Sequence, residues 1–479
     1  MLNDCVASGL EVFVPGADNP WDRAKLNHLL LRTGFGAAPQ EIEAYLQMDP
    51  SQLVDQLIDD AINLPLPEKP DWADWVLDDY DEQEEAIEQI FSWIKKWLSD
   101  MYDHGLREKM ALFWHNHFVT SIDEYFCPSY LYRYHKLLQK YAVGNFKELT
   151  VEMGTTPAML IYLNGVQNTR FQPNENYARE LLELFTLGRD NNYTEDDIKE
   201  IARALTGWNG FTEACADIGF VPLLHDSGSK TIFGETGNFD YNGLHDLLFD
   251  VRKEEIADRI CRKLLLEFVG KEINEEILEG LKQVFLENDF EIAPVLRTLF
   301  KSAYFFDAEQ LGTKISSPIE LLIKQTKQIG IKPEEDDFLI IYSVAAQLNQ
   351  QLLSPPDVSG WPGDQNWLNS SLLAIRWSVL EGYIGLLYSR NRASIGDFGK
   401  LVTNHFNDVD LVCRDIIHHL IPWGLPFPSD YEAAIDVFKA EIPQNYFDDG
   451  SWNIEWEVFP EQVAILLIHL VKQPEYQLI

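Results

Sequence analysis

Residues 173–188, with the sequence PNENYARELLELFTLG, hold the densest group of chemically active side chains in the chain. At 3.6 residues per turn, three carboxylates, an amide and a guanidinium share one side of the helix that this segment predicts. These residues are Glu175, Asn176, Arg179, Glu180 and Glu183. Carboxylates can transfer protons or ligate a metal, and a guanidinium can stabilise negative charge. The alternative is a surface ion-pair ladder, because Arg179 lies four residues from both Glu175 and Glu183.

Two histidines, His115 and His117, lie close together in the segment FWHNHF. Imidazole is a common metal ligand. Residues two apart on a helix point about 200° away from each other, so both rings could reach one metal only from extended or frayed backbone. The alternative is that one histidine is satisfied in the core and the other binds backbone.

The segment HDSGSK places His225, Asp226 and Lys230 in a predicted loop. A base, a carboxylate and a cation on a loop form a candidate reactive group, since loops often carry active residues. The alternative is structural, with Asp226 capping a turn.

The segment WPGDQNW presents Trp361 and Trp367 around Asp364, with Arg376 on the following predicted helix. Exposed aromatic rings beside carboxylates suit sugars and other ring-bearing ligands. The alternative is that both tryptophans fill the helical core, because large aromatic side chains are mostly buried.

Together these segments predict a metal-assisted enzyme, either a hydrolase or an oxidoreductase. The expected metal ligands are His115, His117, Glu180, His225 and Asp226. The expected catalytic groups are Arg179, Lys230 and Glu175, and the expected substrate-binding residues are Asn176, Trp361, Asp364, Trp367 and Arg376. Mixed imidazole and carboxylate ligands suit zinc, iron, manganese or copper. The sequence contains none of the familiar zincin, di-iron, nucleotide-binding or α/β-hydrolase motifs.

The elements that must position these residues are helices. Apolar residues recur at helical spacing through most of the chain and strand-like alternation is scarce, which predicts an all-α fold with little or no sheet. We expect a large, irregular multi-helix domain with long functional loops. The predicted parts are a tail over 1–20, a main helical domain over 21–390 and a C-terminal helical part over 391–479, packed on the main domain. Within the main domain we expect an acidic helix at 71–98, a long loop at 209–243 and a tryptophan-rich loop at 353–369.

Charge limits the classes of partner. The 479 residues carry a formal net charge of −39, which repels phosphate backbones and argues against nucleic acid as a partner. No apolar run approaches the roughly 18 residues that a membrane helix needs, so we expect no membrane span.

The five cysteines are isolated and no C-x-x-C occurs, so neither a zinc ribbon nor a disulfide framework is indicated, although one or two bridges stay open. The N-terminus has no recognisable signal peptide. The sequence as it stands therefore predicts a cytoplasmic protein, or a periplasmic or extracellular one if a leader was removed.

Eight segments resemble a large bacterial family known only as domain of unknown function number 1800. They are LLRTGFG (30–36), EKMALFWHNHFVTS (108–121), PAMLIYLNG (157–165), PNENYARELLELFTLG (173–188), YTEDDIKEIARALTGW (193–208), HDSGSKTIFG (225–234), KISSPIELL (314–322) and PPDVSGWPGDQNWL (355–368). The resemblance runs from about residue 21 to the C-terminus. It implies a mostly helical protein, often exported and often encoded beside a sulfatase-like partner, and it implies no established activity.

Two further functions stay open beside the metal-assisted enzyme. One is a non-catalytic helical scaffold for the sulfatase-like partner that the resemblance implies, in which the polar segments would serve packing and capping. The other is a carbohydrate-binding module that uses Trp361 and Trp367.

Overall fold

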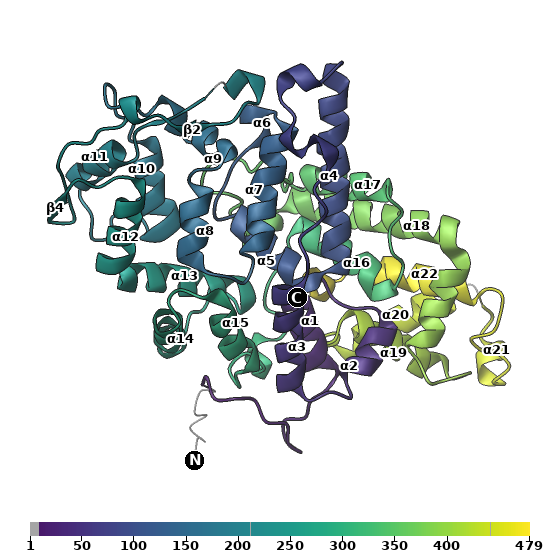
Figure 1. Ribbon diagram of the computed structural model, residues 1–479. Helices are drawn as coiled ribbons and strands as arrows, with labels where there is room; N and C mark the ends of the chain where they lie inside the picture. Colours follow the sequence, from purple (N-terminus) through teal and green to yellow (C-terminus); the bar gives the residue numbers. More distant parts are fainter. Residues whose placement is uncertain (1–8, 211, 441) are drawn as a thin grey trace, which may run out of the picture.

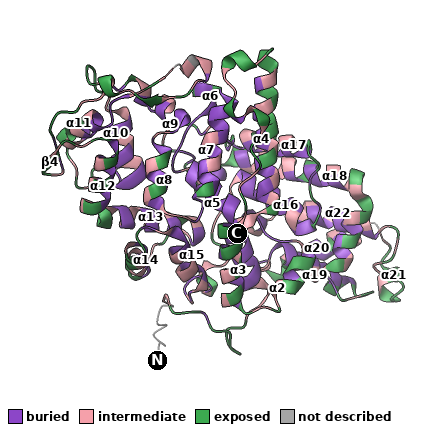
Figure 2. Cartoon of the chain, in the orientation of Figure 1, coloured by how far each residue is buried: buried purple, intermediate pink, exposed green. Residues whose placement is uncertain are grey.

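The all-α prediction is confirmed by a computed structural model, which describes residues 9–479 except 211 and 441. Within these residues, 22 α-helices and four short strands surround a continuous core (Figure 1). The exposed residues lie on the outer faces of the helices, and the buried residues line the interior (Figure 2).

The first half of the chain contains the helices α1 (Arg23–Thr33), α2 (Pro39–Tyr45), α3 (Pro50–Asn63), α4 (Gln83–Asp103), α5 (Gly105–His115), α6 (Ile122–Tyr125), α7 (Pro128–Lys140), α8 (Phe146–Met153), α9 (Pro157–Tyr162), α10 (Asn176–Glu180) and α11 (Glu195–Ala204). The chain continues from α10 directly into a π-helix, η4 (Leu181–Thr186).

Two small antiparallel hairpins separate the two halves. They pair β1 (Trp208–Asn209) with β2 (Gly219–Phe220), and β3 (Lys230–Ile232) with β4 (Glu235–Gly237). The second half contains α12 (Tyr241–Val251), α13 (Lys253–Phe268), α14 (Glu275–Glu287), α15 (Ile292–Lys301), α16 (Pro318–Ile329), α17 (Asp337–Gln347), α18 (Ser370–Leu401), α19 (Val409–Leu420), α20 (Pro428–Lys439), α21 (Asn445–Asp448) and α22 (Phe459–Leu470).

Local sequence signals fix many helix ends. α16 begins with a reciprocal capping box between Ser317 and Glu320, has proline at its first position, and ends at Gly330, whose φ is +76°. Gly188, with φ of +97°, terminates the segment that opens with α10. α10 begins at Asn176, and the side chain of Asn174 accepts a hydrogen bond from the Asn176 N–H.

The centre of the molecule is built from α4, α5 and α7, which pack on one another. Their fully buried side chains include Trp97, Trp114 and Tyr134. The last residues return to this centre, where Figure 1 marks the C-terminus, and Ile479 exchanges two backbone hydrogen bonds with Lys314. The start of α16 and the end of the chain are therefore held together.

Residues 71–98 do not form the single acidic helix that we expected. Two 3₁₀ turns, η1 (Asp71–Asp74) and η2 (Leu77–Asp79), precede α4, which starts at Gln83 and runs on to Asp103. Asp79 caps its own short turn by accepting from the Val76 N–H, which favours a local turn over a continuing helix.

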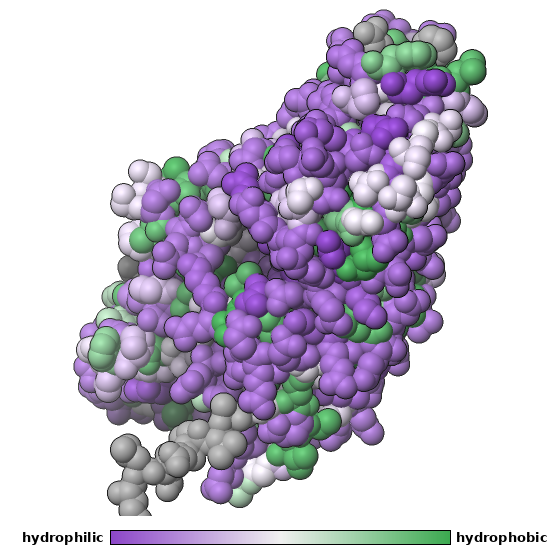
Figure 3. Space-filling view, turned by 90° about the vertical axis from the view of Figure 1, so that its left-hand side faces the viewer, coloured by the Kyte–Doolittle hydropathy of each residue, from purple (hydrophilic) through white to green (hydrophobic). Residues whose placement is uncertain are grey.

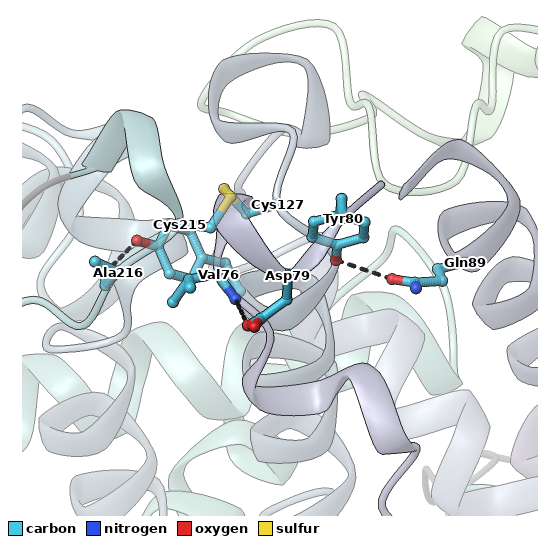
Figure 4. The surroundings of a disulfide bond; sticks show 8 residues. Val76, Asp79, Tyr80, Gln89, Cys127, Cys215 and Ala216 are labelled. Atoms are coloured by element: carbon cyan, nitrogen blue, oxygen red, sulfur yellow. Dashed lines mark hydrogen bonds between the residues drawn. A yellow bond between two sulfur atoms is a disulfide. The ribbon is translucent and has the colours of Figure 1, made fainter. Parts of the chain in front are cut away.

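The expected long loop at 209–243 contains both hairpins and is anchored by a disulfide between Cys127 and Cys215 (Figure 4). Cys127 is the residue that precedes α7, and Tyr130 on the first turn of that helix donates a hydrogen bond to the carbonyl of Ala216. Cys261 and Cys413 are buried free thiols, and Cys5 lies outside the described residues.

The other expected boundaries fall as follows. Part of the predicted tail packs on the body, because Phe13 is buried and its N–H donates to the Lys301 carbonyl. Residue 390 lies inside α18, whose backbone leaves the helical region at Asn391.

The surface is mainly hydrophilic on the face shown in Figure 3. Among the described helices, none combines the length and the apolar character that crossing a bilayer requires.

Candidate active site

A cavity of about 780 Å³ lies where α5, α13, residues 309–320 and the tryptophan-rich loop meet. The size is typical of small-molecule sites, which span roughly 300–1,000 Å³. Three of the segments that carry the family resemblance line it, namely 108–121, 314–322 and 355–368. The cavity therefore brings together parts of the chain that are far apart in sequence.

Helical spacing determines which residues of α5 and α13 face the cavity. From α5 and its C-cap come Lys109, Leu112, Phe113 and Asn116, three or four residues apart. From α13 and the turn after it come Lys263, Leu266, Glu267 and Gly270, with the same spacing. Each helix thus presents one continuous face to the cavity.

Two lysines and two glutamates form an ionic wall, which we define as Lys109, Lys314, Glu267 and Glu320. Glu267 Oε1 lies 3.2 Å from Lys109 Nζ and 2.7 Å from Lys314 Nζ. Glu320 Oε1 forms an ion pair with Lys109 and lies 3.5 Å from Lys314 Nζ. The other oxygen of Glu320 accepts from the Ser317 N–H at 2.7 Å, so the capping box of α16 also positions the wall.

Burial and neighbouring charge oppose each other in the ionic wall. Burial lowers the pKa of Lys109 to about 7, with a further contribution from the Lys314 charge, although Glu267 acts in the other direction. Burial alone would raise the pKa of Glu267, but the Lys314 and Lys109 ammonium groups outweigh it and lower the pKa to about 2. The Glu267 carboxylate is therefore ionised at neutral pH.

Lys263 differs from the lysines of the wall. Its Nζ lies 2.8 Å from Nδ1 of His117, and within the described part of the chain no carboxylate forms an ion pair with it. Burial lowers its pKa to about 7, and the nearby Arg259 charge adds to this effect. Lys263 is therefore a cavity-lining amine that is substantially neutral at physiological pH.

His117 fixes the position of this amine. Its Nε2–H donates to the carbonyl oxygen of Phe185 at 3.0 Å, which leaves Nδ1 as the acceptor for Lys263. The ring is buried against Phe118 and Phe146, and burial holds its pKa well below the ordinary value. Phe185 belongs to the π-helix η4, so the segment 173–188 reaches the cavity through one backbone carbonyl.

The tryptophan-rich loop closes the opposite side. Asn116 ties it to α5, because its Oδ1 accepts from the Trp361 N–H at 2.6 Å and its Nδ2 donates to the Trp361 carbonyl. Gly360 permits this approach: its φ is +83°, and a Cβ there would lie 2.2 Å from Asn116 Oδ1. Asp364 forms an ion pair with Lys271 at the rim.

Trp361 and Trp367 line the cavity but are only 4% and 5% exposed. They are walls and not a surface platform, so these positions give no support to the carbohydrate-binding alternative. Arg376 does not line the cavity. It is fully buried and donates to Gln477, to the Ser316 carbonyl and to the Trp367 carbonyl, which fixes the end of the loop.

His115 holds the start of the same loop. Its Nε2 accepts from the Leu353 N–H at 3.2 Å, and its Nδ1–H donates to Tyr134 at 2.7 Å. Burial lowers the pKa of His115 to about 3. Both ring nitrogens are therefore used, and the imidazole is neutral at ordinary pH.

The polar face of α10 lies in an ion-pair ladder. Arg179 contacts Glu195 at 2.8 Å, Glu183 at 3.2 Å and Glu175 at 3.6 Å, and the arginine is 34% exposed. Glu180 is half-buried on this face, and burial, reinforced by Glu183, raises the pKa of its carboxyl. Asn176 is also half-buried. None of these side chains lines the cavity.

His225, Asp226 and Lys230 fasten the loop that carries the hairpins. Asp226 pairs with Arg203 at 2.8 Å and accepts from the Gly228 N–H, while Lys230 donates to the carbonyls of Asp226 and Gly228. The Nδ1–H of His225 donates to the Thr206 carbonyl. The observed contacts are those of the structural alternative, in which Asp226 caps a turn.

The expected metal ligands do not meet. Across residues 9–479, with 211 and 441 left aside, no group of three or more histidines, cysteines, aspartates and glutamates is arranged to hold a metal ion. The donor atoms of His115, His117 and Asp226 are occupied by the hydrogen bonds and ion pairs described above.

Sequence reasoning missed the residues that make the cavity chemically distinctive. These are Lys109, Lys263, Glu267, Lys314 and Glu320. Lys263 and Glu267 are four apart on an amphipathic helix, the pattern of an ordinary surface pair. One of these residues could have been found from the sequence. Lys109 precedes FWHNHF by one helical turn and lies in segment 108–121, which carries the family resemblance.

The structure is that of an all-α protein with a cavity lined by lysines and carboxylates. The model of a family described as "Protein of unknown function (DUF1800)" matches residues 28–478, and the chain belongs to this family. Neither the curated proteins nor the solved structures include a match.

Proposed function

We propose that this protein is an enzyme that acts on a small organic anion bound in the lysine-lined cavity. The observation that carries the proposal is Lys263, which lines the cavity with a histidine partner and without a carboxylate partner in the described ion pairs. A desolvated lysine binds an anion when it is charged and accepts a proton when it is neutral. With a pKa of about 7, Lys263 can serve in either role near neutral pH.

The surroundings of Lys263 suggest the kind of ligand. In the ionic wall Glu267 and Glu320 balance the charges of Lys109 and Lys314, so the positive charge left for a ligand is that of Lys263, and Phe113 and Trp361 supply aromatic surface. An anion with an apolar or ring-bearing part matches both surfaces.

The metal-assisted reaction predicted from sequence has less support. Of its expected ligands, His115, His225 and Asp226 hold loops through hydrogen bonds or ion pairs, and His117 is bonded to Lys263. The scaffold role and the sulfatase-like partner stay predictions. The cavity and the position of Lys263 in it lead us to favour the enzyme.

Ligand-dependent thermal stabilisation tests the proposal. Leu266 lines the cavity and is 42% exposed, so Leu266→Trp should obstruct the cavity without removing a charge. Leu411, 39% exposed on α19 and remote from the lining, gives the matched control Leu411→Trp. We expect benzoate and phenylpyruvate to raise the melting temperature of the wild type and of Leu411→Trp, and neutral benzamide to have a smaller effect.

Leu266→Trp should lose this stabilisation while retaining its own melting temperature to within a few degrees. Equal stabilisation of Leu266→Trp and the wild type would show that the anions bind elsewhere and would overturn the proposed site. A wild type that responds to none of the anions would also contradict it.

A further inference from the structure

We propose that the substrate carries an aldehyde or ketone carbonyl and that Lys263 forms an imine with it. This inference rests on the proposed function and adds the reacting group. It stands on the position of the amine, which lines the cavity and is held from one side by His117.

The geometry leaves Lys263 free to attack. A neutral amine has two hydrogens and one lone pair, and one hydrogen is donated to Nδ1 of His117. His117 cannot rotate to offer a proton instead, because its Nε2–H is committed to the Phe185 carbonyl. The lone pair and the second hydrogen of Lys263 therefore remain for a ligand in the cavity.

Among the ion pairs of the described residues none involves Lys263, and this separates it from its neighbours. Lys109 and Lys314 form ion pairs with the glutamates of the ionic wall, so a reacting carbonyl would have to displace a carboxylate from them, even though burial lowers the pKa of Lys109 to about 7 as well. For Lys263, burial and the Arg259 charge favour the neutral form, which is the nucleophile in imine formation. Of the cavity lysines, it is therefore the one prepared for covalent chemistry.

The reaction needs no further reagent. The nitrogen lone pair of Lys263 forms the C–N bond while the carbonyl π pair moves to oxygen, and one amine hydrogen transfers to that oxygen to give a carbinolamine. The second amine hydrogen then leaves with the hydroxyl group as water, and the nitrogen lone pair forms the C=N bond. Oxidation states do not change, and water reverses the sequence.

The ionic wall beside Lys263 sets no charge preference for the substrate. Glu267 follows Lys263 by one helical turn and carries Lys109 and Lys314 on its carboxylate. Together with Glu320, the two glutamates balance the two lysines, so a neutral aldehyde or ketone fits beside Lys263 as well as a 2-oxo acid does.

Reductive trapping tests the imine directly. The full-length protein is incubated at pH 7 with pyruvate, phenylpyruvate or butanal together with cyanoborohydride, which reduces imines to stable amines. Peptide mass spectrometry then measures the reduced adduct at each lysine. The internal control is Lys253, an exposed lysine at the start of the same helix.

We expect the adduct of a 2-oxo acid at Lys263 to exceed that at Lys253 by about tenfold or more, because far more of the buried amine is neutral at pH 7. Lys263→Met should lose this adduct, and Lys253→Met should keep it. Labelling of Lys263 no greater than that of Lys253 with all three carbonyl compounds would overturn the inference.

The two proposals fail separately. If benzoate and phenylpyruvate stabilise the wild type but not Leu266→Trp while Lys263 is not trapped, the cavity binds anions and the imine is wrong. If Lys263 is trapped above Lys253 while the anions stabilise neither the wild type nor Leu411→Trp, the imine forms and the proposed anion site is wrong.

Discussion

The Nζ of Lys263 lies 2.8 Å from Nδ1 of His117, although 146 residues separate the two in the chain. The histidine was expected to bind a metal from its sequence context. In the structure it orients an amine, and its ring helps to exclude water from that amine. This relationship links α13 to the turn after α5 and gives the first prediction.

Replacing His117 by alanine should raise the pKa of Lys263 from about 7 toward the ordinary lysine value, because water would enter the space of the ring. The midpoint of Lys263 labelling against pH measures this change. Lys253 should keep its midpoint in the same samples, and circular dichroism should show a folded variant. An unaltered midpoint at Lys263 would mean that the histidine does not control the amine.

Gly360→Ala should destabilise the protein more than Gly363→Ala does, by about 1–3 kcal/mol. Both glycines have positive φ, at +83° and +71°, so backbone strain is shared by the two variants. Only at Gly360 would the new Cβ meet Asn116, whereas the space around Gly363 is open. Urea unfolding measures the difference, and equal values would show that the contact between Asn116 and the loop is not structurally important.

Removing the disulfide with Cys127→Ser and Cys215→Ser should reduce the free energy of unfolding by about 2–4 kcal/mol, since the bridge closes a loop across 88 residues. A reductant should lower the melting temperature of the wild type and leave the double variant unaffected. Cys261 and Cys413 are buried free thiols in the wild type and in the double variant, so they do not account for a difference between the two proteins in their response to the reductant. Insensitivity of the wild type to reductant would contradict the bridge as a stabilising element.

Stability should fall as the pH is lowered from about 6.5 toward 4. Burial lowers the pKa of His115 to about 3, and those of His245 and His419 to about 4. Below pH 6.5 the unfolded chain binds protons at these positions and the folded chain does not. Each histidine therefore lowers the free energy of unfolding by about 1.4 kcal/mol for each pH unit of acidification in this window. This loss continues until the pH reaches the folded pKa of each histidine.

Unfolding free energies at intervals between pH 7 and pH 5 measure this dependence. His28, His117 and His135 are also buried, with pKa values held well below the ordinary value, so His245→Gln removes one of six such histidines and should make the slope shallower by about a sixth. A slope that does not respond to this variant would assign the acid sensitivity to other groups.

The disulfide also bears on location. Such bridges persist mainly in oxidising compartments. On this ground we propose that the protein is exported, and fractionation of the native cells would test export against a cytoplasmic location.

The fold class and many element ends follow from local sequence patterns. Helical periodicity, N-capping residues and glycine terminators act over a few residues, so α16 with its capping box and the stop at Gly188 follow from local chemistry. The same periodicity could not tell whether the polar face of α10 meets water or a site. Solvation decides that question, and solvation depends on every element packed nearby.

Only the tertiary structure decided the candidate site. Lys263 and Glu267 resemble a surface pair in sequence, and they become a site because α5 and the start of α16 bury them beside Lys109 and Lys314. Burial changes the pKa of a lysine far more than its sequence neighbours do. The candidate site therefore depends on contacts between segments far apart in the chain, 47 residues for Lys314 and Glu267 and 146 for Lys263 and His117, and no local pattern encodes them.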